Sequence, residues 1–136
     1  MTHDINSVML FIHPPLAIMG YFFLAAAFAF NLRYSNKDLG GWTRTRTMLI
    51  VAWVLELLGI VTGAIWAQIA WGSYWSWDPK ETVSLVLFIC MSAYGFVVFR
   101  WPEKKAVQIV LGVLALVSIL VTLSVNWLIT GLHSYV

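Results

Sequence analysis

Long apolar segments alternate with short polar segments along this chain. Four segments are apolar over about 18 to 25 residues, close to the length at which a helix crosses the hydrocarbon core of a membrane, and they lie at about residues 8–32, 48–70, 82–99 and 106–129. No low-complexity linker or long internal repeat separates them. The pattern therefore predicts an all-α, polytopic membrane protein with four transmembrane helices in a single membrane domain, residues 1–136.

The composition agrees with a lipid environment. Hydrophobic residues make up 61% of the 136 positions and charged residues 10%, whereas soluble domains are nearer half apolar and a quarter charged. The single cysteine, Cys90, lies inside an apolar segment, which excludes a disulfide framework and a thiolate metal cluster. We interpret the net charge of +2 as basic residues that orient the chain in the membrane. We expect no nucleic-acid partner.

The basic residues of the connections predict how the chain crosses the membrane. Seven of the eight Lys and Arg residues lie in the first and third connections, residues 33–47 and 100–105, and Lys80 lies in the middle one. Because cytoplasmic loops carry the excess of Lys and Arg, both termini and the middle loop, residues 71–81, are expected on the outer face. That face belongs to a prokaryotic cytoplasmic membrane or its organellar equivalent. The N-terminal segment has no basic residue, so we expect a retained helix and not a cleavable signal peptide.

One acidic residue lies within the second span. A carboxylate such as Glu56 is costly in lipid unless it is protonated, paired or facing a cavity, and the third span offers Ser92 and Tyr94 at a similar depth. A structural hydrogen bond between helices and a role in binding a proton or ligand are both open. Gly59 and Gly63 form a GxxxG pair in the same span, which favours close packing of a neighbouring helix.

Aromatic residues are concentrated around the middle loop. Four tryptophans and one tyrosine lie within the twelve residues from Trp66 to Trp77. An interfacial belt of Trp and Tyr is one interpretation, although it explains two or three rings better than a cluster. The other is a platform for a flat apolar ligand such as a porphyrin, because ring contacts add roughly 0.5 to 1.5 kcal/mol each beyond area burial. Gly72 would let the backbone approach such a ligand closely.

The loop ends in a helix-start signal. Asp78 is expected to be the N-cap, Pro79 the first helical residue and Glu81 the third, which is the Asp variant of a capping box. Capping does not exclude a ligand contact for Asp78. Lys80 is expected to pair with a propionate or with lipid phosphate.

Two histidines are expected at the level of this loop. His13 lies near the outer start of the first span and His133 just past the outer end of the last, whereas His3 lies on a short tail. Neutral imidazole is a common axial ligand of haem iron, so two imidazoles from separate helices could clamp a ring on the aromatic platform. Structural roles for both are the alternative. Zinc is disfavoured because it usually takes three or four protein ligands.

These features resemble a known family. The segment WAQIAWGSYWSWDPKET, Trp66 to Thr82, resembles the WWD signature of the cytochrome c assembly proteins, the haem-handling family that includes CcsA, CcmC and CcmF, and it is most similar to CcsA. Residues 131–135, GLHSY, resemble the second external histidine motif of that family, and His13 falls where the first is expected.

The resemblance implies a function and a site. Family members present haem at the outer membrane face and pass it to apocytochrome c, whose Cys-X-X-Cys-His thiols add to the vinyl groups. For this chain it implies that His13 and His133 ligate the iron of a non-covalent b-type haem. It also implies a haem platform made of Trp71, Trp75, Trp77 and Asp78.

The chain departs from the family pattern in two respects. The family synthases are larger, and CcsA-like proteins are expected to carry a further histidine where this chain has Phe96, which argues against an inner haem site. We therefore expect a component of a holocytochrome c synthase, or haem lyase, that works with other membrane assembly subunits. The alternatives are a haem b-bearing electron-transfer anchor of a respiratory complex, and a non-catalytic assembly subunit that uses the aromatic loop as a protein interface.

Overall fold

The computed structural model consists of four long helices, α1 (Thr2–Arg33), α2 (Leu39–Trp71), α3 (Pro79–Arg100) and α4 (Lys105–His133). The structure describes the backbone of residues 2–33 and 39–133, and the side chains of residues 8–9, 11–33, 40–125 and 127–128. Each helix contains a segment long and apolar enough to cross a membrane. The predicted all-α fold with four membrane-spanning helices is therefore confirmed.

The helices extend beyond the apolar segments that the sequence marks. α2 begins at Leu39, so residues 39–47, expected to belong to the first connection, are helical. Hydropathy locates only the part of a helix that lies in lipid, whereas backbone hydrogen bonds continue the helix into the polar interface. In the same way, α3 begins at Pro79 and α4 continues to His133.

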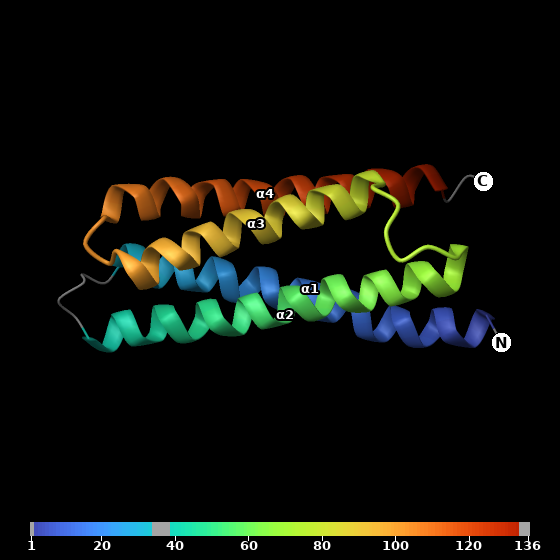
Figure 1. Ribbon diagram of the computed structural model, residues 1–136, viewed down its shortest axis with the longest axis horizontal. Coiled ribbons are helices and arrows are strands. Elements are labelled where there is room, and N and C mark those ends of the chain that lie inside the picture. The colour runs from blue at the N-terminus through green and yellow to red at the C-terminus, as the bar shows by residue number, and fades with distance from the viewer. Residues whose placement is uncertain (1, 34–38, 134–136) are drawn as a thin grey trace.

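The bundle is built from two antiparallel hairpins. α1 packs along α2 and α3 along α4, and further contacts join α2 to α3 and α1 to α4. The loop between α2 and α3 lies at the same end of the bundle as both chain termini (Figure 1). The two basic connections lie at the opposite end, which is called the basic end below (Figure 1).

Small residues bring α1 and α2 close together. A Cβ atom added at Gly59 would contact Ala17 of α1 at 3.8 Å, and one added at Gly63 would lie 2.9 Å from Cε1 of His13. The GxxxG pair therefore faces α1, as the sequence indicates. This close approach places the His13 ring directly against the backbone of α2.

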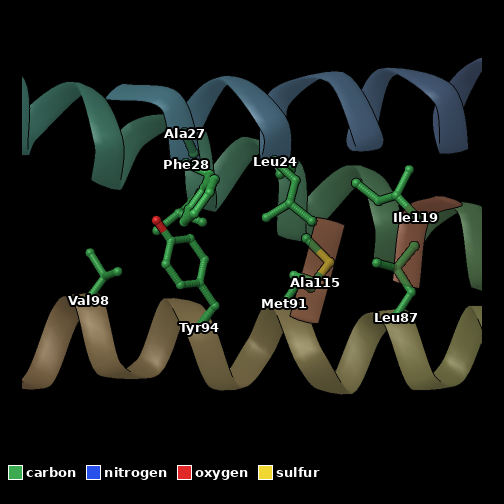
Figure 2. Close-up of a cluster of buried hydrophobic side chains, with 11 residues drawn as sticks. Leu24, Ala27, Phe28, Leu87, Met91, Tyr94, Val98, Ala115 and Ile119 are labelled. Atoms are coloured by element: carbon green, nitrogen blue, oxygen red, sulfur yellow. The ribbon is translucent and has the colours of Figure 1, made fainter. Parts of the chain in front are cut away.

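The apolar core lies where the hairpins meet. Figure 2 shows the side chains of α1 facing those of α3 across this core. The rings of Phe28 and Tyr94 are arranged edge to face, with centroids 5.8 Å apart and planes at 73°. Residue 112 of α4 must be a glycine, because a Cβ atom at this position would collide with the Phe28 ring. The buried apolar members of the core are Leu24, Ala27, Phe28, Leu49, Ala52, Leu87, Met91, Tyr94, Val98, Ala115 and Ile119.

A hydrogen-bonded polar cluster joins three helices near the basic end. The Nδ2 group of Asn31 donates to the Tyr94 hydroxyl at 2.8 Å and to Oε1 of Gln108 at 3.1 Å. The Lys105 ammonium donates to Oδ1 of Asn31 at 2.7 Å. Polar side chains that satisfy one another between helices stabilise membrane bundles. These four residues, called the Asn31 cluster below, tie α1 to α3 and α4.

Candidate functional site

His13 lies on α1, in the half of the bundle that carries the aromatic loop. Its Nδ1 is 3.2 Å from Oγ1 of Thr62, and the Thr62 hydroxyl lies 2.8 Å from the carbonyl oxygen of Leu58 and 3.1 Å from that of Gly59. Because the one hydroxyl hydrogen is donated to these carbonyls, the Thr62 oxygen accepts from the Nδ1–H of His13. The lone pair of the neutral ring is then on Nε2, the arrangement an imidazole needs to ligate a metal.

Residues on both sides of the aromatic loop act on His13. Gly63 leaves room for its ring, since a Cβ atom there would lie 2.9 Å from Cε1. The indole of Trp66 stands edge-on to the imidazole, with centroids 6.0 Å apart and planes at 71°. These contacts of His13 all come from the part of α2 that precedes the loop, and the charge of Lys80, the second residue of α3, acts on the imidazole from the other side of the loop sequence.

The loop from 72 to 78 follows a defined backbone path. Gly72 has φ +78° and its N–H donates to the carbonyl of Gln68 at 2.9 Å, so the glycine ends α2 in the left-handed conformation typical of helix C-termini. Trp77 also has a left-handed φ of 59°, which costs about 1 to 3 kcal/mol for a residue other than glycine. Such strained residues concentrate at ligand sites and switch regions.

The start of α3 confirms the predicted N-cap. Oδ1 of Asp78 accepts from the N–H of Glu81 at 2.8 Å, and Pro79 is the first helical residue. The second half of the capping box differs from the prediction. Oε2 of Glu81 accepts from the N–H of Ser76 at 2.7 Å, because the left-handed turn at Trp77 brings that N–H back toward the helix. The Glu81 carboxylate therefore fastens the loop onto α3.

The aromatic side chains of the loop differ in exposure. Trp71 and Trp77 each expose 66% of their surface and Tyr74 exposes 59%, whereas Trp75 is half-buried. The rings of Trp75 and Trp77 are perpendicular, with centroids 5.5 Å apart and planes at 89°, so only one of them can lie flat against a planar ligand. Nε1 of Trp75 is a buried donor without a partner among the described residues.

His133 ends α4, and its side chain lies outside the described residues. Gly112 of α4 lies against Phe28 of α1, and the two helices run in opposite directions (Figure 1). Counted from that contact at 1.5 Å per residue, the backbones of His13 and His133 reach the same end of the bundle at levels that differ by roughly 9 Å. The pairing of the two imidazoles stays a prediction.

Glu56 lies deeper in α2 and bonds to neither of its expected partners. Its side chain is 3% exposed and faces Gly20 of α1, where a Cβ atom would collide with Oε1. That oxygen has no hydrogen-bond partner among the described residues. Ser92 accepts from the Trp53 indole at 3.0 Å instead, and Tyr94 belongs to the Asn31 cluster. Glu56 therefore forms no hydrogen bond with either residue, because Trp53 of its own helix engages Ser92 and Asn31 of α1 engages Tyr94.

Sequence reasoning missed Thr62 and Trp66 as neighbours of His13. A signal for them was present, because Thr62, Gly63 and Trp66 lie with Gly59 on one helical face. Once the glycine pair is taken to face α1, the other two residues must face it as well. What the sequence did not supply is the axial register that puts His13 opposite this face.

Four long apolar helices define an integral membrane protein, and the described site combines an oriented imidazole with an exposed aromatic loop. The chain belongs to the cytochrome C assembly protein family, whose model matches residues 1–133. No solved structure matches the chain.

Curated relatives named cytochrome c biogenesis protein CcsA match part of the chain. The protein from Gloeobacter violaceus is 46% identical over 84 residues, which cover 60% of this chain and 24% of the relative. The protein from Pyropia yezoensis is 48% identical over 87 residues, covering 60% and 26%. A Synechococcus protein is 38% identical over 107 residues, covering 77% and 34%. The matched region is thus about a quarter to a third of the length of these relatives.

Proposed function

We propose that this chain takes part in cytochrome c biogenesis by binding haem at the outer membrane face and presenting it to apocytochrome c. The observation that carries the proposal is the oriented imidazole of His13, whose Nδ1 is bonded to Thr62 beside the edge of Trp66. Membership of the cytochrome C assembly protein family supports the direction of the proposal.

The residues present suit a haem ligand. The lone pair on Nε2 of His13 is the kind of donor that haem iron requires. Because residue 63 is a glycine, no side chain at that position collides with the imidazole ring. The exposed indoles of the loop offer apolar surface to a porphyrin. We propose that the iron ligands are His13 and His133, and that the platform consists of Trp71, Trp75, Trp77 and Asp78.

The chemistry of attachment belongs to haem and to the acceptor. When bound, haem supplies the vinyl groups to which the thiols of a Cys-X-X-Cys-His segment add. In this proposal the chain contributes positioning: the imidazoles hold the iron, the indole rings exclude water, and the exposed loop leaves one side accessible to the acceptor. We propose that further membrane assembly subunits act together with this chain.

Haem ligation is tested by spectroscopy of the purified protein. The chain is reconstituted with haem in mild detergent, and oxidised, reduced and pyridine haemochrome spectra are recorded. We expect His13→Ala to lose haem or shift its absorbance bands, because iron loses a nitrogen ligand, and we expect the same of His133→Ala. His3→Ala is the matched control and should behave as the wild type. Wild-type spectra in both of the first two variants would show that the ligand assignment is wrong.

Addition of an apocytochrome with a Cys-X-X-Cys-His segment separates the three functions considered from the sequence. Presentation predicts that haem leaves this protein and appears on the acceptor. Haem that stays in place indicates an electron-transfer anchor, and failure to bind haem at all indicates a non-catalytic assembly subunit.

A further inference from the structure

Arg46 of α2 is held by two aromatic rings at the basic end of the bundle. Its Cζ lies 4.3 Å from the ring centroid of Trp42, one turn earlier on α2, and 4.5 Å from that of Phe99, near the end of α3. Contacts with aromatic faces fix a guanidinium in place without using its N–H groups. Arg46 is therefore positioned while its hydrogen-bonding capacity is left for other atoms.

Two buried donors at this point have no acceptor among the described residues. They are Nε of Arg46 and Nε1 of Trp42. A buried donor without an acceptor costs free energy, and guanidinium N–H groups match the oxygens of phosphate in a fixed fork. The Arg46 side chain is partly exposed, so part of its guanidinium is accessible to a ligand.

An apolar groove begins at Phe99 and runs between α2 and α3. It is an open groove with a volume of about 330 Å³. A Cβ atom added at Gly95 would meet nothing within 4 Å, so the groove is open at that residue. The lining consists of Leu49, Ile50, Trp53, Met91, Ser92, Gly95, Phe96 and Phe99.

The groove and the cation form one continuous surface. Arg46, Ile50 and Trp53 follow the spacing of a single helical face, and Trp53 lies about 10 Å along α2 from Arg46. The polar groups at the far end bond to one another, since the Trp53 indole donates to Ser92 and the Ser92 hydroxyl donates to the carbonyl of Phe88. The groove therefore offers a ligand an apolar surface with positive charge at one end.

We propose that this surface binds an anionic phospholipid, with its phosphate at Arg46 and one acyl chain in the groove. The charge of the headgroup complements the basic end, where Arg44, Arg100 and Lys104 also lie, and basic sites between membrane helices bind anionic headgroups. An acyl chain suits a groove about 10 Å long better than a partner helix does, because a spanning helix needs about 20 residues.

Haem also combines anionic groups with an apolar body, and the groove is less suited to it. No imidazole lines the groove, and the one lining thioether, Met91, is 2% exposed. The test therefore includes added haem as a competitor of the lipid.

The test compares two lipids of identical acyl chains, phosphatidylglycerol and phosphatidylcholine, bound to the detergent-purified full chain and measured by native mass spectrometry. We expect Arg46→Gln to weaken phosphatidylglycerol binding by about tenfold or more, since a charge-assisted phosphate contact is lost. The preference for the anionic lipid should also fall, because phosphatidylcholine has the same phosphate but no net charge, so only phosphatidylglycerol loses a net attraction to the removed cation. Arg44→Gln is the matched control, because it removes one positive charge of the basic end from an exposed residue that does not line the groove. It should lower the binding of phosphatidylglycerol much less than Arg46→Gln does and keep the preference for the anionic lipid. Circular dichroism verifies that each variant is folded.

A second variant tests the groove independently of the charge. Gly95→Leu should fill the open space and weaken both lipids. Equal binding of the two lipids by the wild type, or wild-type binding by Arg46→Gln and Gly95→Leu, would overturn the proposal. It would also be overturned if inorganic phosphate protected the protein from thermal unfolding as well as phosphatidylglycerol does, or if added haem displaced the lipid.

Discussion

The Thr62 hydroxyl and the Gly59 backbone together favour the tautomer of His13 that carries its hydrogen on Nδ1. The hydroxyl hydrogen of Thr62 is donated within α2, so its oxygen is left to accept from Nδ1 at 3.2 Å. Residues that orient a ligating histidine in this way fix both its tautomer and its ring position. A threonine about two and a half helical turns from the end of α2 therefore has a direct bearing on the proposed haem site.

Replacing this hydroxyl tests its role. We expect Thr62→Val to lower haem affinity about 10-fold to 100-fold, the usual effect of removing a residue that orients a metal ligand, while helix content is unchanged. Thr47→Val is the matched control, because the Thr47 hydroxyl bonds only to a carbonyl of its own helix, that of Thr43. Haem titration monitored by absorbance gives both affinities. Equal affinities for the two variants would exclude Thr62 as a positioning residue.

The residues named from the sequence and those found in the structure differ for a physical reason. The N-cap at Asp78 could be predicted because its signal is local, a residue type next to a helix start. The role of His13, which lies well inside α1, stays a prediction. The contact of Glu56 with Gly20 and that of Arg46 with Phe99 could not be predicted, because they depend on the register between different helices. From the sequence, Arg46 was interpreted only as one of the basic residues in the first connection. In the structure it lies on α2, and its guanidinium contacts the Phe99 ring of α3.

The N-cap of α3 gives Asp78 a structural role that must be separated from haem contact. We expect Asp78→Ala to destabilise the first turn of α3 by about 1 kcal/mol, and Asp78→Asn to keep the cap, because Asn and Asp are about equally good N-caps. Amide hydrogen exchange of residues 80–82 should then be about fivefold faster in the alanine variant alone. Identical exchange in the two variants would contradict the capping role.

The asparagine variant also isolates the proposed ligand role. It keeps the cap and removes the charge, so a lower haem occupancy in Asp78→Asn supports a contact with haem. Full occupancy would leave Asp78 as a cap only.

The helices themselves were predictable where hydropathy decides them. Four apolar segments gave the number and order of the helices because a backbone in lipid must satisfy its own hydrogen bonds. The first two turns of α2 were not predictable in this way, since Gly40 and Gly41 are poor helix formers. Packing overrides that preference there: Thr45 is 1% exposed and its hydroxyl donates to the Gly41 carbonyl at 3.0 Å.

At the scale of the whole molecule, we expect the Asn31 cluster to hold the two hairpins together, and substitutions in the cluster test this. We expect Asn31→Leu to lower the free energy of unfolding by about 2 to 4 kcal/mol, because Tyr94 and Gln108 lose partners while staying buried. The double variant with Gln108→Leu should cost less than the sum of the single variants, since the residues share a network. Unfolding in mixed detergent micelles measures each value.

The control for the cluster is an exposed hydroxyl on α4. Ser124→Ala removes a bond to the carbonyl of Leu120 in the same helix, so the free energy of unfolding should change by no more than about 0.5 kcal/mol. A similar small change in Asn31→Leu would show that the cluster does not hold the bundle together.

The position of the Asn31 cluster near one end of the bundle makes it a pivot. From Tyr94 to Pro79, α3 extends about 22 Å beyond the cluster, so a rotation of about 5° between the hairpins moves the loop end of α3 by about 2 Å. His13 belongs to one hairpin and the end of α4 to the other. The spacing between the two proposed iron ligands therefore depends on the angle between the hairpins. A ligand bound between α2 and α3 at the basic end would change that spacing if it bound one angle more tightly than another.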